Sequence, residues 1–180
     1  FVKNDWNIKE FIAAITATQA YQRSIRVQGK QSDVDPDGRF LSHRKVQRMT
    51  AESVRDNLLQ FSGSIDRSLY GQPVKAYLTP YMTGRGRPAQ SGPIDGDKRR
   101  TLFIEVRRNF LNPFLLAFDA PLPATSFGQR SQTNVPAQSL SMLNDPFVEL
   151  MANRWLEQQK SLAITDEEAL QRLFLQAFSR

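Results

Sequence analysis

The chain has 180 residues, of which 40% are hydrophobic and 23% charged, and its formal net charge is +6. This composition is close to the globular average, so the chain can bury a core of ordinary size. It contains no apolar run of the roughly 20 residues that a membrane helix needs. It also contains no cysteine, which excludes disulfides, thiolate metal sites, a cysteine nucleophile and covalent haem attachment within the segment. Because the chain starts at Phe1 and ends at Arg180 inside an apolar periodic stretch, we expect 1–180 to be a single helical domain, a fragment of a larger multidomain protein.

The first predicted helix covers residues 8–23. Ile8, Phe11, Ile12 and Ile15 recur at the spacing of one helical face. Asn7 precedes them as a cap with Glu10 as its capping-box partner, and Trp6 and Phe11 occupy the positions of a hydrophobic staple.

A polar loop over 28–38 separates this helix from a second one, predicted over 50–62. Val54, Leu58 and Phe61 form its apolar stripe, and Gly63 can end it in a left-handed conformation. Residues 71–100 contain five glycines and four prolines, which predicts a long irregular loop. Residues 101–106 are apolar and β-branched, so they are the one predicted extended segment, and its strand partner is not identifiable.

The remaining predicted helices each begin at a recognisable start signal. Proline at the first helical turn predicts helices over 113–118, 136–143 and 146–160. Thr165 and Glu168 form a capping box that opens the last one. We therefore expect a mainly α fold with about six helices in an irregular orthogonal arrangement, one short extended segment and the long Gly/Pro-rich loop.

Six segments, spread in order over most of the chain, match the pattern of one family. They are ITATQAYQRS (15–24), RMTAESVRD (48–56), FSGSID (61–66), RRN (107–109), PFLLAFDAP (113–121) and TNVPAQSLSMLNDPF (133–147). The chain thus resembles the C-terminal domain of unknown function 1553 of large planctomycete-type proteins, which often carry a cytochrome c domain.

The resemblance implies an exported bacterial protein, periplasmic or at the cell surface, in which this segment follows a companion domain. It supplies no activity. The haem-binding Cys-x-x-Cys-His motif of the cytochrome portion does not occur in this chain. We therefore expect no cofactor in this fragment, and any haem to lie outside it.

Two motifs suggest metal or catalytic sites, and each has a simpler interpretation. Asp33, Asp35, Asp37 and Gly38 match the start of a calcium loop, but Arg44 stands where a bidentate Glu is required. A solvated Asp/Pro/Gly turn is favoured, and no metal site is predicted. His43 is the only histidine and has no partner motif, so a surface or capping role is favoured for it.

Charged and amide side chains recur at element ends, where binding residues concentrate. Arg48, Glu52, Arg55 and Asp56 share one helical face, which favours an ion-pair network that holds the second helix to 107–109 over a charged wall that orients a loop or ligand. Further polar residues could form a pocket whose arginines grip carboxylate, sulfate or sugar hydroxyls, or could satisfy buried backbone groups. The candidate cluster is Arg48, Glu52, Arg55, Asp56, Arg107, Arg108, Asn109, Asp119, Arg130, Thr133, Asn134 and Asn144.

A basic chain favours anionic partners without selecting one. Residues 85–108 carry seven Lys/Arg and three Asp/Glu, but Phe103 is the one aromatic residue among them that could stack on a base, so nucleic acid is a disfavoured partner. We expect a non-catalytic interaction or scaffold module that packs against its companion domain. The alternatives are part of an enzyme acting on polysaccharide or in redox chemistry, and a module that binds anionic glycans such as acidic polysaccharide.

Overall fold

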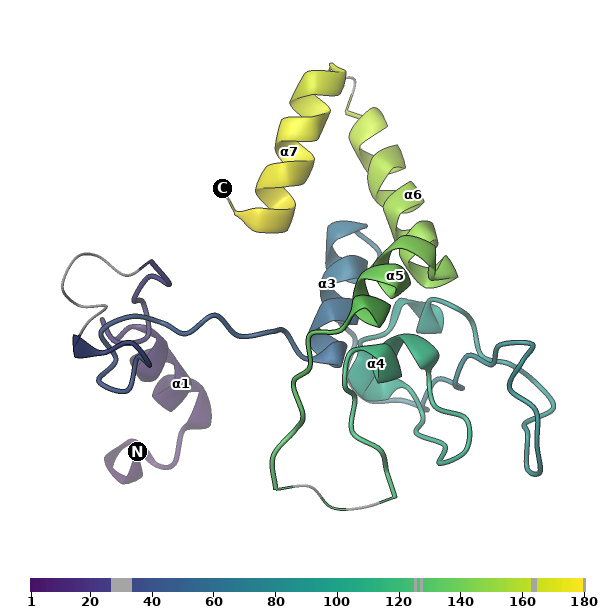
Figure 1. Cartoon of the computed structure of the whole chain (residues 1–180), viewed down its shortest axis with the longest axis horizontal. Helices are drawn as coiled ribbons and strands as arrows, with labels where there is room; N and C mark the ends of the chain where they lie inside the picture. The colour runs from purple at the N-terminus through teal and green to yellow at the C-terminus, as the bar shows by residue number, and fades with distance from the viewer. Residues whose placement is uncertain (27–33, 125, 127, 163–164, 180) are drawn as a thin grey trace. The chain divides into compact units, whose positions relative to one another are not determined.

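The computed structural model describes residues 1–26, 34–124, 126, 128–162 and 165–179. Within them the chain forms six α-helices and short 3-10 turns, with isolated bridges in place of a sheet, which confirms the mainly α prediction. Figure 1 shows the course of the chain. It divides into two compact units, Phe1–Arg48 and Met49–Arg180, which are described separately. The single domain over 1–180 stays a prediction.

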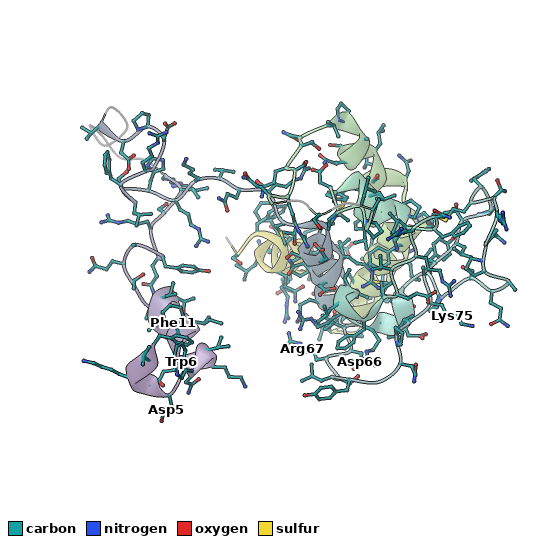
Figure 2. All side chains as sticks on the ribbon, turned by 90° about the horizontal axis from the view of Figure 1, so that it is seen from below. Asp5, Trp6, Phe11, Asp66, Arg67 and Lys75 are labelled. Atoms are coloured by element: carbon teal, nitrogen blue, oxygen red, sulfur yellow. The ribbon has the colours of Figure 1, made fainter. Side chains whose placement is uncertain are left out.

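The first unit contains the 3-10 turn Val2–Asn4 and helix α1, Ile8–Thr16. Asn7 accepts a hydrogen bond from the backbone N–H of Glu10, as its predicted cap role requires. The ring of Phe1 packs against both Trp6 and Phe11, which are labelled in Figure 2.

Helix α1 is shorter than predicted, because it ends at Thr16 instead of continuing to residue 23. The Thr16 hydroxyl donates to the carbonyls of Ile12 and Ala13, and the Thr18 hydroxyl donates to that of Ile15. Side-chain hydroxyls that bind the last carbonyls of a helix compete with its continuation. The apolar face of α1 is solvent-exposed, with Ile8 at 63% and Phe11 at 45%.

The second unit is built on helices α3 (Ala51–Phe61), α4 (Pro113–Ala117), α5 (Pro136–Asn144), α6 (Pro146–Lys160) and α7 (Asp166–Phe178). Thr50, Asn112, Asp145 and Thr165 cap α3, α4, α6 and α7 with their side chains, and Thr165 was predicted in this role. Gly63 has a φ of 64°, the left-handed conformation expected after α3.

The core of this unit lies between α3, α4 and α6, which run close together in Figure 1. Its buried members are Ala51, Leu59, Phe114, Phe118, Phe147, Val148 and Met151. The ring of Phe114 contacts the rings of Phe118 and Phe147 at 5.0 and 5.5 Å between centroids. Burying each such side chain contributes about 1.5–3 kcal/mol, so these contacts fix how the three helices pack.

Between α3 and α4 the chain is irregular, apart from the 3-10 turns Gly96–Lys98 and Thr101–Phe103. The prediction of an extended segment over 101–106 is therefore wrong for residues 101–103, which form a 3-10 turn. Its second half forms a single parallel bridge, Val74 with Ile104, through hydrogen bonds from Val74 N–H to Phe103 and from Glu105 N–H to Val74. The segment that pairs with it thus comes from the long loop.

Candidate functional site

Arg55 is the central polar residue of the second unit, and its side chain is only 1% exposed. Its guanidinium donates to the carbonyl oxygens of Asp95 at 2.6 Å and Arg99 at 3.0 Å, and to the hydroxyl of Thr101 at 3.1 Å. Burial lowers the pKa of Arg55 to about 10, although the carboxylates of Asp56 and Asp95 favour its charged form. The guanidinium therefore remains charged at neutral pH and supplies hydrogen bonds to backbone carbonyls of the loop.

Asp56 extends the same contact from the next position of α3. Its carboxylate accepts hydrogen bonds from the backbone N–H and the hydroxyl of Thr101, at 2.8 and 2.7 Å. Asp95, in turn, accepts from Arg154 of α6 at 2.9 Å. Arg55 and Asp56 thus hold α3 to residues 95–101, and not to 107–109 as predicted. The approach is close, because a Cβ atom on Gly96 would lie 2.5 Å from Nη2 of Arg55.

Glu52, Asp56, Arg100 and Glu105 line a neighbouring pocket, and each belongs to an ion pair. Arg130 contacts Glu52 at 2.8 Å, Arg100 contacts Asp56 at 3.4 Å, and Arg107 contacts Glu105 at 2.9 Å. Their arginines are the more exposed partners, at 48%, 47% and 46%, against 34%, 20% and 22% for the carboxylates.

Both glutamates of these pairs have a lowered pKa. Burial opposes ionisation of Glu52, but the hydrogen bond from Arg130 and the charge of Arg130 outweigh it. For Glu105 the hydrogen bond from Arg107 is the main cause, and burial partly offsets it. Both carboxyl groups are therefore ionised at neutral pH.

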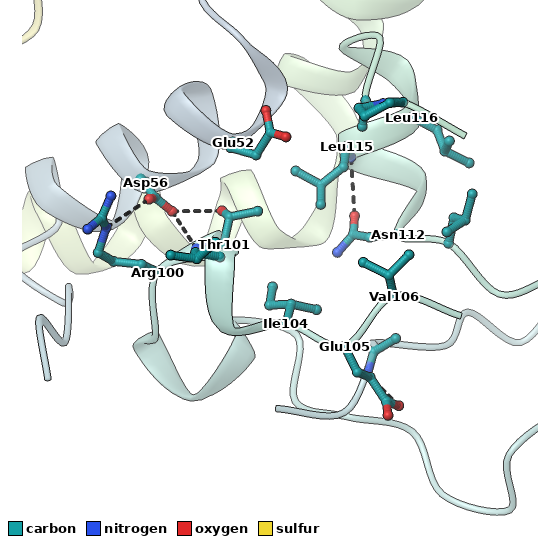
Figure 3. A pocket seen from close by; sticks show the side chains of 15 residues that line it. Glu52, Asp56, Arg100, Thr101, Ile104, Glu105, Val106, Asn112, Leu115 and Leu116 are labelled. Carbon is teal, nitrogen blue, oxygen red and sulfur yellow. Dashed lines mark hydrogen bonds and ion pairs between the residues drawn. The ribbon is translucent and has the colours of Figure 1, made fainter. Parts of the chain in front are cut away.

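The pocket has a volume of about 410 Å³ and a mostly apolar wall. Figure 3 shows Ile104, Val106, Leu115 and Leu116 on its sides, with Asp56, Arg100 and Thr101 joined by hydrogen bonds at one end. Asn112 also lines it, and its side-chain oxygen accepts from the backbone N–H of Leu115. Pockets of this size and lining are typical of small-molecule sites.

Asp119 and Thr133 form a second polar contact. Asp119, at a φ of 62°, accepts from the backbone N–H of Thr133 at 2.7 Å and from its hydroxyl at 3.0 Å. The buried Gln138 donates to the hydroxyl of Thr133 and accepts from the backbone N–H of Val135. These bonds join the two ends of the connection between α4 and α5. They match the prediction that Asp119 and Thr133 satisfy backbone groups in this connection.

The other predicted residues have different surroundings. Arg48 precedes α3 because Thr50 caps that helix, so it does not share the face of Glu52 and Arg55. Asn144 donates to the carbonyl of Leu140 in its own helix. Arg108, Asn109 and Asn134 are exposed. Among the twelve candidates, the structure brings together Arg55 and Asp56, Glu52 and Arg130, and Asp119 and Thr133.

Several residues that complete these contacts were missed by sequence reasoning. Glu105, Arg100 and Asp95 lie in irregular segments, where no periodicity indicates which way a side chain points. The only local signal was their charge within a stretch rich in glycine and proline.

The two earlier motifs in the first unit form turns. Asp35 accepts from the backbone N–H groups of Arg39 and Phe40, at 2.7 and 3.0 Å, and from the hydroxyl of Ser42. Asp33 lies outside the described residues. The Ser42 hydroxyl also lies 3.0 Å from Nδ1 of His43. Within the described part of the chain, no group of three or more His, Asp or Glu side chains is placed to hold a metal ion.

The described helices include none with both the length and the apolar character that crossing a membrane requires. No curated protein and no solved structure matches the sequence. Residues 1–180 match the family described as "PSD1: Protein of unknown function (DUF1553)". The match covers the whole chain, in agreement with the resemblance carried by its six motifs, and the chain belongs to this family.

Proposed function

We propose that the chain is a non-catalytic interaction module that packs against a companion domain of the same exported protein, with α7 as its docking surface. The observation that carries this proposal is the exposed apolar face of α7. Leu170, Phe174 and Phe178 are 67%, 54% and 58% exposed. Large apolar side chains gathered on one surface are characteristic of interaction sites.

Helix α7 is joined to α6 by a hydrogen bond between two side chains. Gln176 accepts a hydrogen bond from the indole of Trp155 in α6 at 2.7 Å, while Leu173 and Ala177 are half-buried. The rings of Phe174 and Phe178 pack on each other, 4.8 Å apart, at helical i, i+4 spacing. The helix therefore keeps a preformed aromatic pair available to a partner, which lowers the entropy cost of docking.

The fate of the candidate polar residues supports a non-catalytic role. Hydrogen bonds join Arg55, Asp56 and Asp119 to backbone groups and to Thr101 and Thr133. Such bonds define how loops attach to helices. Loss of these hydrogen bonds should therefore lower the stability of the fold before it affects any binding.

Sedimentation velocity of this chain mixed with the companion domain of its full-length protein tests the proposal. The expected result is a complex that forms with wild type and is lost with Leu170→Asp. Leu143→Asp is the matched control, since Leu143 is 80% exposed on α5. Absence of a complex with wild type, or equal binding by Leu170→Asp, would contradict the proposal.

The enzymatic and glycan-binding alternatives stay predictions. A glycan-binding role predicts salt-sensitive retention on a sulfated-sugar column, because exposed charge pairs are screened by salt. Retention that persists in Arg107→Gln and Arg130→Gln would argue against the arginines considered for it.

A further inference from the structure

A second pocket runs along α3, and unlike the apolar one it is lined mainly by polar side chains. Four of them come from α3 at positions i, i+3, i+4 and i+7, which form one stripe along the helix: Ser53, Asp56, Asn57 and Gln60. Ile65, Arg67 and Arg100 complete the lining. The pocket, called the polar groove below, has a volume of about 460 Å³, which lies in the range of small-molecule sites.

Two arginines reach this stripe from outside the helix. Nη2 of Arg67 lies 2.6 Å from Oε1 of Gln60, and Nε of Arg100 lies 3.4 Å from Oδ2 of Asp56, as Figure 3 shows for the second pair. Asp56 and Gln60 are four positions apart on α3, and side chains at this spacing are neighbours, with Cβ atoms roughly 5–6 Å apart. The two guanidinium groups are therefore anchored on neighbouring side chains and can contact the same ligand.

The single carboxylate of the groove does not cancel this positive charge. Asp56 accepts hydrogen bonds from the backbone N–H and the hydroxyl of Thr101, and the buried guanidinium of Arg55 lies 3.7 Å from it. The charge of Asp56 is thus balanced from inside the fold. The exposed Arg67 contacts the neutral amide of Gln60, and none of the ion pairs among the described residues includes it. A guanidinium has five N–H donors, so Arg67 can bind an oxyanion while it keeps this contact.

Between the arginines, the stripe offers hydrogen-bond donors and acceptors together. Each side-chain amide has an acceptor oxygen and an NH₂ group with two donors. In the contacts of the described residues, Asn57 uses a donor toward the carbonyl of Ser53, and Gln60 uses its oxygen toward Arg67. The oxygen of Asn57 and the NH₂ group of Gln60 can therefore serve a ligand. Sugar hydroxyls need both kinds of partner, and the half-buried Ile65 offers an apolar surface to the C–H face of a sugar ring.

We propose that the polar groove binds an acidic sugar. Its carboxylate or sulfate lies between Arg67 and Arg100, and its hydroxyl groups contact Asn57 and Gln60. A uronic acid and a sulfated sugar share this chemistry. The site uses arginines other than Arg107 and Arg130, which were considered above for glycan binding, and it does not depend on docking by α7.

NMR titration of the isotope-labelled chain with glucuronate, glucose sulfate, glucose, acetate and inorganic sulfate tests the ligand class. At least one acidic sugar should bind at least about tenfold more tightly than glucose, the factor that one charge-assisted hydrogen bond contributes. The same sugar should bind more tightly than acetate or inorganic sulfate, which carry the charge without the hydroxyl groups. A preference for glucuronate or for glucose sulfate identifies the acidic group, and either supports the proposal. Equal binding of glucose or of the simple anions, or no binding of either acidic sugar, would overturn it.

Variants locate the site on the chain. Arg67→Gln should weaken binding of the preferred sugar at least about tenfold, whereas Arg108→Gln, which removes the same charge from another exposed position, should not change it. Gln60→Leu should weaken binding about fivefold, and Gln171→Leu, at an exposed position of α7, should leave it unchanged. Equal effects of the members of either pair would contradict a site in the polar groove. Leu170→Asp should retain sugar binding, which separates this test from that of docking by α7.

Discussion

The guanidinium of Arg55 donates to the main-chain carbonyl of Asp95 at 2.6 Å, across forty residues of sequence. With the bonds to Arg99 and Thr101, this contact attaches the long loop to α3. The ring of Phe147 lies 5.3 Å below the same guanidinium. Arg55 therefore joins α3, the loop and α6 at one point.

Replacement of Arg55 should destabilise the fold strongly. Arg55→Met keeps much of the volume but removes the hydrogen bonds to the Asp95 and Arg99 carbonyls and to the Thr101 hydroxyl, and we expect a loss of about 3 kcal/mol or more in the free energy of unfolding. Urea denaturation followed by circular dichroism measures it. The exposed Arg172→Met serves as control and should unfold like wild type. Unchanged stability of Arg55→Met would show that the hydrogen bonds of Arg55 are not needed for folding.

Gly96 should not tolerate a side chain. Its φ is 62°, and a Cβ atom there would be forced against Nη2 of Arg55. Gly96→Ala should cost about 1–2 kcal/mol from the left-handed conformation alone, and more if Arg55 shifts. Gly128→Ala meets no neighbour within 4 Å and should be nearly neutral in the same thermal unfolding experiment. Equal melting temperatures for the two variants would mean that the loop can move away from α3.

The helix starts could be predicted from sequence because each depends on a few adjacent residues. Thr50, and the pair of Thr165 and Glu168, cap their helices through bonds that span three positions. The capping bond of Thr165 with Glu168 needs no information from the rest of the chain.

Long-range contacts were not predictable in this way. The composition of 101–106 favoured a strand, but Arg55 and Asp56 hold Thr101, from 46 and 45 residues away, at the start of a 3-10 turn. The sequence likewise could not indicate which distant segment contacts α3, so the prediction of 107–109 was wrong. The pairing of Glu105 with Arg107 and its place beside the pocket could be found only from the fold.

Asp119 and Thr133 should be energetically coupled. Asp119→Asn retains a side chain suited to the left-handed φ of this position but loses the ionised acceptor. We expect it to cost about 1–2 kcal/mol, with Thr133→Val costing a similar amount, and the double variant costing less than the sum. Chemical denaturation of the four proteins gives the coupling. Strict additivity would show that the two side chains act independently, and unchanged stability with loss of ligand binding would favour a site.

The start of α7 should be sensitive to acid. The hydrogen bonds from Thr165 hold the pKa of Glu168 below its usual value of 4.5. Because the unfolded chain then binds this proton more readily, the stabilisation is fully present above pH 4.5 and is lost as pH falls through the lower folded pKa. Glu168→Gln keeps the acceptor and removes the charge, so its stability deficit in urea at pH 6 should disappear near pH 3. A stability deficit that is independent of pH would show that it comes from altered hydrogen-bond geometry and not from the lost charge.

Hydrogen–deuterium exchange of this chain, with and without the proposed companion domain, tests whether α7 is a docking surface. Exchange over Asp166–Phe178 should be slower in the mixture, with α3 unchanged and the effect abolished by Phe174→Asp. Unchanged exchange in α7 while a complex forms would contradict it, because the partner would then bind another surface.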